Sequence, residues 1–485
     1  MTPMNTATRG VAWSAVERFA TIGIQFVMNI IIARILSPSD YGIIGMLTVF
    51  LSISQCLVDS GFTSALIQTK KRSERDYGTV FVFNLAISVL LYLILFVCAP
   101  LISRFYGLDI LTDVLRIVGL VLIISALSNV QKTIFTINVD FKTQSLVSIP
   151  GAIISGVIGI LLAYGGFGVW ALVAQTLTNG IVVTALFWVF SRERFRIVFD
   201  VESFKRLGGF GVKLMLSSLL NTAYNNLYAL FIGKKYSAEK LGYYSRADQL
   251  AVFPANTLTD IISRVAYPML CGCQNSKEEL SSVYTKFIKN SCYIIFPIMV
   301  GLAVLSKPLI IVLLTEKWLQ AAILLSILAL DGLWSPIIRV NLNLLQAVGR
   351  SDLFLRLEII KKTISVGILL ITLQYGLIWI CLGRFFYGII ALLINMYYTV
   401  EIIDKSYVEQ IKDWFPNLLL AIVMGASMLM SIHFIISPVI QLLIGAIVGI
   451  TIYFSLSFVF KFGAAMQLYN KANSFYVSIK RDFGL

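Results

Sequence analysis

The sequence predicts an all-α integral membrane protein of about fourteen transmembrane helices, in two parallel six-helix lobes plus two C-terminal helices. Its composition is the first reason, because 58% of the residues are hydrophobic and 13% are charged, with a mean hydropathy of +0.85. Soluble domains carry roughly 25% charged residues. Apolar runs of membrane-spanning length recur along the whole chain, and short matches relate its two halves.

Each predicted span is an apolar run near the roughly 20 residues that an α-helix needs to cross the hydrocarbon core of a bilayer. The first run is too long for the apolar region of a signal peptide and lacks a small-residue cleavage site, so we expect it to be a span. The predicted spans are residues 11–33, 42–67, 78–100, 117–138, 144–164, 169–190, 208–232, 250–272, 290–313, 320–345, 357–374, 377–400, 415–436 and 439–460.

An internal repeat supports the grouping into two lobes. Ser37–Gly42 aligns with Ser237–Gly242, and each stretch joins the first and second helix of a six-helix unit. Because six is an even number, the halves are predicted to be parallel repeats related by an axis along the membrane normal. The predicted domains are an N-terminal lobe at 1–200, a C-terminal lobe at 201–405, two added spans at 406–461 and a cytoplasmic tail at 462–485.

The basic residues of the loops predict the orientation. With the N-terminus inside the cell, 24 Lys and Arg residues lie in cytoplasmic loops and 9 in outer loops. The positive-inside rule therefore places both termini in the cytoplasm. The same clusters account for the net charge of +14, so we expect no nucleic acid partner.

Catalytic and cofactor-binding signals are missing from the sequence. Cys271 and Cys273 form a single C-x-C pair without a neighbouring His or further Cys, which is weak evidence for a metal. Motifs of P-loop nucleotide binding, zinc proteases and serine hydrolases do not occur, and no loop is long enough for a catalytic domain. We expect a protein that is not an enzyme and that binds no cofactor and no metal.

Charged residues inside the predicted spans are the candidate site. A charge at the bilayer centre costs on the order of 2.5–3.5 kcal/mol, so such residues normally face a cavity or a partner. Basic residues outnumber acidic ones in this set, which suits an anionic ligand such as a pyrophosphate. Lys213 and Arg339 lie near span ends, so snorkelling to the headgroups is an alternative. The predicted substrate-binding residues are Arg18, Arg264, Arg384, Lys213 and Arg339.

The acidic residues inside the predicted spans are expected to have two different roles. Asp260 and Arg264 are four residues apart, so they are predicted to form a structural ion pair on one helix face. Asp59 and Asp331 have no basic residue three or four positions away. These two are the predicted ion-coupling residues, with H⁺ or Na⁺ as the ion.

Three stretches resemble a known family. "ARILSPSDYGIIGMLTVF" (Ala33–Phe50) is similar to the signature of spans 1 and 2 in Wzx-type polysaccharide or O-antigen flippases, of the polysaccharide-transporter branch of the multidrug/oligosaccharidyl-lipid/polysaccharide superfamily. "LLTEKWLQAA" (Leu313–Ala322) and "LLQAVGRSDL" (Leu344–Leu353) resemble the loops around their span 10.

The resemblance implies two six-helix lobes around a central cavity, alternating access and a place in the bacterial inner membrane. The implied substrate is an undecaprenyl-pyrophosphate-linked oligosaccharide repeat unit for O-antigen, capsule or exopolysaccharide. Membrane lipid and the glycan-assembly machinery are the implied partners.

Two other functions stay open from the sequence. A cation-coupled multidrug exporter of the same superfamily would move small, often cationic molecules, which the basic excess disfavours. A membrane glycan polymerase or glycosyltransferase would need a large extracytoplasmic loop, which the sequence lacks. A channel is a weaker alternative because of the paired-lobe pattern.

Overall fold

The protein is helical throughout the part that the computed structural model describes, which comprises residues 20–59, 61–191, 195–463 and 466. No described residue lies in a β-strand. The chain divides into two compact units, Met1–Gly242 and Tyr243–Leu485, which we call the N-terminal and C-terminal units. The predicted lobe and tail boundaries at residues 200, 405 and 461 stay predictions.

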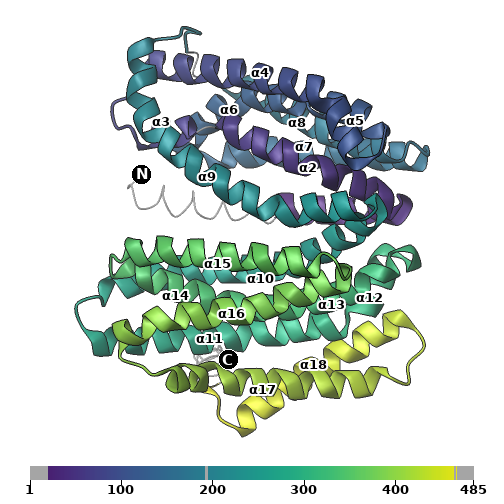
Figure 1. Cartoon of the computed structure of the whole chain (residues 1–485), viewed down its shortest axis with the longest axis vertical. Coiled ribbons are helices and arrows are strands. Elements are labelled where there is room, and N and C mark those ends of the chain that lie inside the picture. Colours follow the sequence, from purple (N-terminus) through teal and green to yellow (C-terminus); the bar gives the residue numbers. More distant parts are fainter. Residues whose placement is uncertain (1–19, 60, 192–194, 464–465, 467–485) are drawn as a thin grey trace, which may run out of the picture. The chain divides into compact units, whose positions relative to one another are not determined.

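In the N-terminal unit, α7 packs along α8, α2 along α9, and α4 along α6 (Figure 1). A core of Phe62, Phe81, Val130, Ile134 and Leu207 joins α3, α4, α6 and α9. The helices of this unit are Ala20–Ile35, α2 (Pro38–Asp59), α3 (Phe62–Gln68), α4 (Glu74–Tyr106), α5 (Ile110–Val118), α6 (Val121–Ile137), α7 (Phe141–Tyr164), α8 (Val169–Phe190) and α9 (Val201–Lys235).

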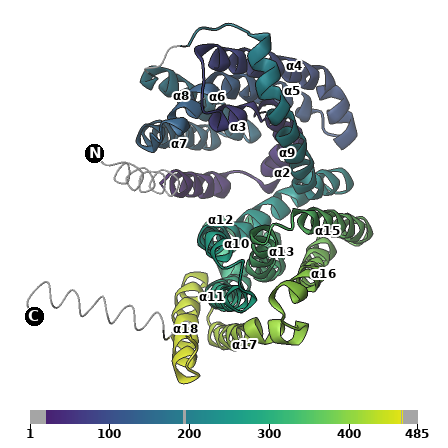
Figure 2. The same ribbon diagram turned by 90° about the vertical axis from the view of Figure 1, so that its left-hand side faces the viewer.

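In the C-terminal unit, α11 packs against α13, α14 and α17, while α16 packs against α13 and α15. The last two helices, α17 and α18, lie side by side next to α11 (Figure 2). The helices concerned are α10 (Ala238–Gly272, which begins at the end of the first unit), α11 (Lys277–Val304), α12 (Ser306–Leu314), η1 (Glu316–Trp318), α13 (Leu319–Asp331), η2 (Gly332–Trp334), α14 (Ser335–Ala347), α15 (Ser351–Thr372), α16 (Leu377–Ile403), α17 (Tyr407–Ile432) and α18 (Pro438–Val459).

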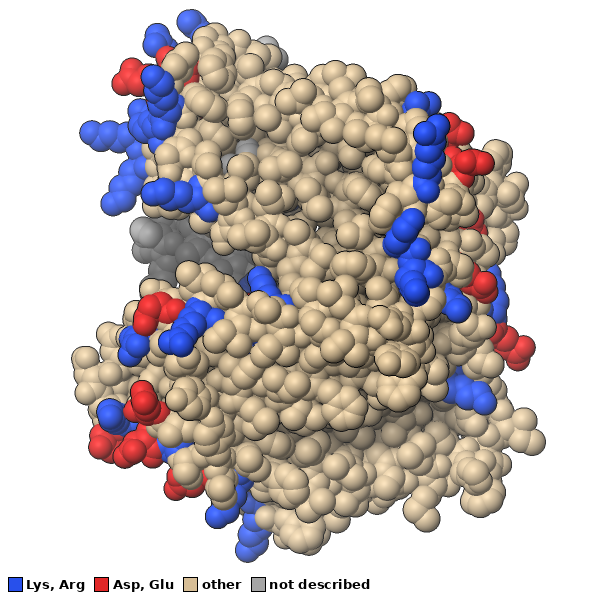
Figure 3. Space-filling view, viewed as in Figure 1, with Lys and Arg blue, Asp and Glu red and all other residues tan. Residues whose placement is uncertain are grey.

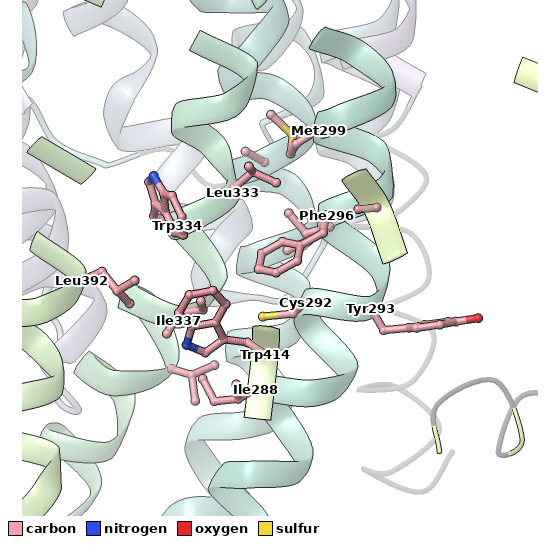
Figure 4. Close-up of a cluster of buried hydrophobic side chains, with 14 of the residues drawn as sticks. Ile288, Cys292, Tyr293, Phe296, Met299, Leu333, Trp334, Ile337, Leu392 and Trp414 are labelled. Atoms are coloured by element: carbon pink, nitrogen blue, oxygen red, sulfur yellow. The ribbon is translucent and has the colours of Figure 1, made fainter. Parts of the chain in front are cut away.

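The core of the C-terminal unit is aromatic and aliphatic. Cys292, Phe296 and Met299 of α11 are buried against Trp334 of η2 and Trp414 of α17 (Figure 4). The two indole rings meet edge to face, with centroids 6.1 Å apart. α17 is therefore part of the core of this unit and not only an addition to its surface.

The predicted all-α membrane fold is confirmed. Ten candidate spans in the described part are long and apolar enough to cross a membrane, by length and composition. α9, α10 and α15 carry the seventh, eighth and eleventh predicted spans as long but more polar helices, and the first predicted span lies partly outside the described residues. The count of fourteen stays a prediction.

Charged side chains gather near the ends of the helices. Figure 3 shows that, within each unit, most Lys, Arg, Asp and Glu side chains lie toward the helix ends, with mostly uncharged residues between them. This is the distribution expected for helices whose middle parts face lipid, because charged groups are costly in the hydrocarbon region.

Local sequence explains how the helices begin. Ser73 is the N-cap of α4 and Ser406 is the N-cap of α17. In each case the backbone N–H of the serine donates a hydrogen bond to the acidic side chain three residues later, and the serine hydroxyl accepts the backbone N–H of that residue, which is a capping box. The short turn before α16 occurs at Gly376, whose φ of 113° favours glycine.

The two halves of the sequence repeat have the same local structure. Ser37 precedes α2, and its hydroxyl accepts the backbone N–H of Asp40 at 3.3 Å. Ser237 precedes α10, and its hydroxyl accepts the backbone N–H of Lys240 at 3.2 Å. Both repeats thus use a serine N-cap to begin a helix.

Breaks between helices fall inside several predicted spans, including the ninth, which contains the end of α11 and the start of α12. The second is divided into α2 and α3 near Gly61, which has φ 67° and lies so close to the Gly211 backbone that a side chain would not fit. The tenth is divided by the 3₁₀ segment η2, directly after Asp331. A short 3₁₀ stretch within a helix often marks a hinge.

The start of α9 is fixed to the start of α4 by a buried carboxylate. Asp76 is fully buried, accepts the backbone N–H of Ser73 at 2.9 Å and forms an ion pair with Arg206 of α9. The Arg206 side chain is half exposed. We call this contact the Asp76–Arg206 pair.

A second contact fixes the same segment. The backbone N–H of Asp200 donates to the hydroxyl of Thr79 at 3.0 Å. Hydrogen bonds from Ser203, together with nearby Arg75 and Arg206, lower the pKa of Asp200, which caps α9. The segment before α9 is thus held to α4 at two points.

Buried polar groups join α17 to the rest of the C-terminal unit. The Asp413 carboxylate of α17 forms ion pairs with Lys289 of α11 at 3.3 Å and with Lys405 at 2.7 Å. The Lys405 ammonium group also donates a hydrogen bond to the Thr285 hydroxyl at 2.6 Å. Nearby, Tyr284 donates to Asn341 at 2.5 Å, and Gln410 accepts from Thr399 at 3.0 Å. We call these eight residues the α17 polar network.

Candidate functional site

A polar cavity of about 830 Å³ lies within the N-terminal unit. Its walls come from α2, α3, α6, α8 and α9. The polar residues that line it carry hydroxyl, amide, carboxylate and ammonium groups, and they are Ser52, Gln55, Asp59, Thr63, Ser64, Asn129, Lys132, Thr133, Thr136, Thr176, Ser218 and Thr222. Such groups can hydrogen-bond to the hydroxyls of a sugar or to water.

Asp59, the last residue of α2, is the acidic group of this cavity. One of its oxygens, Oδ1, accepts from the Gln55 amide at 3.1 Å and from the Asn129 amide at 2.8 Å. Ser125 Oγ lies 3.0 Å from Gln55 Oε1, which orients that amide toward the carboxylate. Asp59 therefore has a preformed hydrogen-bonded site.

In the C-terminal unit, three charged side chains from three helices meet. The Arg384 guanidinium of α16 donates to Asp248 of α10 at 2.6 Å and to the Tyr244 hydroxyl at 2.7 Å. It also forms an ion pair with Asp331 of α13 at 3.3 Å. Arg384 and Asp331 are mostly buried, each with 19% of its side chain exposed. We call Asp248, Arg384 and Asp331 the charge triad.

The ion pair expected between Asp260 and Arg264 is not formed among the described residues. Asp260 instead pairs with Arg339 of α14 at 3.4 Å, with both side chains nearly half exposed. An i, i+4 spacing permits contact on one helix but does not exclude a partner from another helix. Here the packing of α14 brings Arg339 to Asp260, and this corrects the expected pairing.

The other predicted cations have different surroundings. Arg264 and Lys213 are exposed, and within the described ranges neither forms an ion pair. Arg18 lies outside the described residues. The structure thus places Asp331 with Arg384 and Asp260 with Arg339, and places Asp59 in the polar cavity, which Lys132 also lines.

Four residues of these sites were missed by the sequence reasoning. Asp248 and Tyr244 precede the predicted eighth span, whose boundary was placed at residue 250, whereas α10 begins at Ala238. Gln55 precedes Asp59 by one helical turn, so its spacing was a usable signal. Asn129 contacts Asp59 only through tertiary packing.

Curated relatives match most of the chain. The succinoglycan biosynthesis transport protein ExoT of Rhizobium meliloti is 27% identical over 391 residues, or 79% of each chain. The teichuronic acid biosynthesis protein TuaB of Bacillus subtilis is 26% identical, covering 71% of this chain and 72% of that protein. The lipopolysaccharide biosynthesis protein WzxC of Escherichia coli is 24% identical over 84% of each chain.

Solved structures share the fold at low sequence identity. A lipid II flippase MurJ in an inward closed conformation aligns with a TM-score of 0.74 and 18% identity, covering 93% of this chain and 98% of that one. An inward-facing multidrug resistance MATE family transporter of the MOP superfamily aligns with a TM-score of 0.61 and 17% identity, covering 81% and 99%.

The model of one family, described as polysaccharide biosynthesis protein, matches residues 31–323, which is more than half of the chain. The matched region contains two of the three stretches that resemble polysaccharide flippases, Ala33–Phe50 and Leu313–Ala322. The resemblance is therefore confirmed. This multi-pass membrane chain belongs to the polysaccharide biosynthesis protein family.

Proposed function

We propose that this protein is a flippase that moves an undecaprenyl-pyrophosphate-linked oligosaccharide repeat unit across the bacterial inner membrane by alternating access. The unit would be a precursor of O-antigen, capsule or exopolysaccharide. Membership of the family supports this proposal, as do the printed roles of relatives in succinoglycan transport, teichuronic acid synthesis and lipopolysaccharide synthesis.

The observation that carries the proposal is the polar cavity of the N-terminal unit. At about 830 Å³ it falls in the roughly 300–1,000 Å³ range of small-molecule sites. Its walls are rich in hydroxyl and amide groups, although it is built from helices of an apolar membrane protein. Most of these polar residues are exposed or partly exposed, and their hydroxyl and amide groups can form hydrogen bonds with the hydroxyls of a glycan.

The exposed cations Arg264 and Lys213 are the candidates to bind the pyrophosphate, together with Arg18. Neither Arg264 nor Lys213 is neutralised by a carboxylate within the described ranges. Arg339 stays a candidate because its pair with Asp260 is half exposed and can exchange partners. Arg384 already contacts two carboxylates, so we assign it to ion coupling and not to substrate binding.

The remaining parts of the proposal concern location and chemistry. The protein resides in the inner membrane with both termini in the cytoplasm and carries out no catalysis. Its substrate, membrane lipid and the glycan-assembly machinery are its partners, and H⁺ or Na⁺ is its coupling ion.

Reconstitution tests the function directly. Purified protein is placed in liposomes with a fluorescent undecaprenyl-pyrophosphate oligosaccharide, and translocation is measured as loss of the label to an impermeant quencher. Thr222→Leu replaces a hydroxyl of the cavity wall and is expected to slow translocation at least tenfold. Thr363→Leu, the same change at an exposed position on α15, should leave the rate unchanged.

The drug-exporter alternative is separated in the same liposomes. The shared fold with a multidrug transporter makes this comparison necessary. Export of cationic dyes without movement of the lipid-linked oligosaccharide would reject the flippase proposal, as would equal rates in empty and protein-containing liposomes.

A further inference from the structure

The charge triad of the C-terminal unit contains more negative than positive charge. Asp248 and Asp331 share the single guanidinium of Arg384. Among the described residues, no other Lys or Arg lies within ion-pair distance of either carboxylate. With both carboxylates ionised, the triad has a net charge of −1 in a largely buried place, where unbalanced charge is strongly unfavourable.

The two carboxylates are not equivalent. Arg384 is 2.6 Å from Asp248, and the Tyr244 hydroxyl lies 2.7 Å from the same nitrogen. The distance to Asp331 is longer, 3.3 Å, and involves the other terminal nitrogen. Asp331 also ends α13 directly before the 3₁₀ segment η2. Asp331 is therefore the carboxylate that Arg384 neutralises less.

Asp331 of α13 and Trp334 of η2 pack so closely against Gly388 of α16 that a side chain at this position would not fit. A Cβ atom at Gly388 would lie 2.9 Å from Asp331 Oδ1 and 3.3 Å from Trp334 Nε1. Trp334 is 7% exposed, and its indole N–H has no hydrogen-bond partner among the described residues. The shortest contact of Arg384 with Asp331 is to the other oxygen, Oδ2. A carboxylate oxygen of Asp331 and the buried indole N–H of Trp334 thus lie beside the same glycine.

We propose that the charge triad is a proton-binding site, in which Asp331 takes up one proton on the oxygen that faces Gly388 and Trp334. Protonation converts the carboxylate of Asp331 to a neutral carboxylic acid and changes the net charge of the triad from −1 to 0. The ion pair between Arg384 and Asp331 is then lost, while Arg384 keeps Asp248.

Proton binding therefore changes how α13 is held to α16. With Asp331 ionised, Arg384 connects α16 to α13 directly before η2; with Asp331 protonated, that connection is released. As part of the proposed flippase cycle, this would couple a proton to movement at the break in the tenth span. The inference rests on the proposed function only for this coupling, because proton binding follows from the triad itself.

The groups that face Asp331 favour a proton over a metal ion. They are Arg384 and the buried Cys381 thiol of α16, Asp248 and Tyr244 of α10, and the indole N–H of η2, while Met299 of α11 packs against the adjacent Gly332. The N–H groups of arginine and indole are hydrogen-bond donors only and are not ligands for a metal ion. Hard cations require several oxygen ligands, whereas a proton requires one.

Infrared difference spectroscopy of the purified protein tests the site without any transport. Spectra at acid and alkaline pH are subtracted to reveal a buried carboxylic acid band. The band is expected in the wild type and should disappear in Asp331→Asn. It should also disappear in Asp248→Asn, since Asp331 and Arg384 then form a neutral pair and Asp331 stays ionised.

The control is Asp352→Asn, which removes an exposed carboxylate paired with Arg350 and should leave the buried band unchanged. Persistence of the band in Asp331→Asn or in Asp248→Asn would overturn the proposal. So would its removal by Na⁺ at constant pH, which would identify a sodium site. A protein that shows the band but moves no lipid-linked oligosaccharide would refute the flippase function and leave the proton site standing.

Discussion

The Asp76–Arg206 pair predicts that a second substitution can restore stability lost by a first. Arg206→Ala leaves the fully buried Asp76 carboxylate without its cation. Removing one partner of a buried pair costs roughly 3–5 kcal/mol. Ser73 still donates a hydrogen bond to this carboxylate, so we expect a loss at the lower limit, about 3 kcal/mol.

Adding Asp76→Asn to Arg206→Ala removes the unpaired charge but keeps the side-chain shape and an acceptor oxygen for Ser73. The double variant is therefore expected to be more stable than Arg206→Ala alone. The gain should fall in the range of about 0.5–3 kcal/mol that is typical of coupling between contacting residues. Asp76→Asn in the wild-type background should destabilise, because it weakens the bond to Arg206.

Thermal unfolding in detergent micelles, followed by tryptophan fluorescence, measures these differences. For a domain of 150–250 residues, 1 kcal/mol corresponds to roughly 2–4 °C, so Arg206→Ala should lower the midpoint by roughly 6–12 °C. Lys205→Ala removes the neighbouring exposed charge and should change stability by less than about 0.5 kcal/mol. A double variant that unfolds at a lower temperature than Arg206→Ala would refute the reasoning.

Four further predictions concern topology, substrate and energy. Single cysteines at Val198 and Ser237 should react with membrane-impermeant reagents from the cytoplasmic and the outer side, respectively; the reverse pattern would reject the orientation. Arg264→Ala and Arg18→Ala should each reduce surface glycan at normal membrane abundance, and normal glycan display in both would exclude them from substrate binding. Asp59→Asn should weaken the response of transport in liposomes to imposed H⁺ or Na⁺ gradients; an unchanged response would exclude this residue as an ion site. An interior-negative potential should speed outward movement of the pyrophosphate lipid, since each charge gains about 2.3 kcal/mol per 100 mV; a rate insensitive to potential would contradict net anion movement.

Hydropathy predicted most of the fold because it is a local property. The positions of α7, α8 and α16 follow from apolar runs bounded by turns with glycine. The interruptions of the second and tenth spans were not predicted. At Gly61 the break accompanies close contact with Gly211, and such a contact depends on how α3 and α9 pack.

The candidate site was predictable in its residue types but not in its pairs. The cost of burying charge identified Asp59, Asp331 and Arg384 as polar residues needing partners. Their actual neighbours come from other helices, as Asn129 does for Asp59 and Asp248 for Arg384. Sequence spacing describes one helix face, so it could not show which helices supply these partners.

The α17 polar network has a consequence for biogenesis. During synthesis, α11 leaves the ribosome before α17, so Lys289 and Tyr284 are made before Asp413 and Gln410 exist. Until α17 is made, Lys289 lacks Asp413, and the buried Tyr284 hydroxyl keeps Asn341 of α14 but lacks Gln410. Chains truncated before α17 should therefore leave polar groups of α11 without these partners and become substrates for membrane proteases.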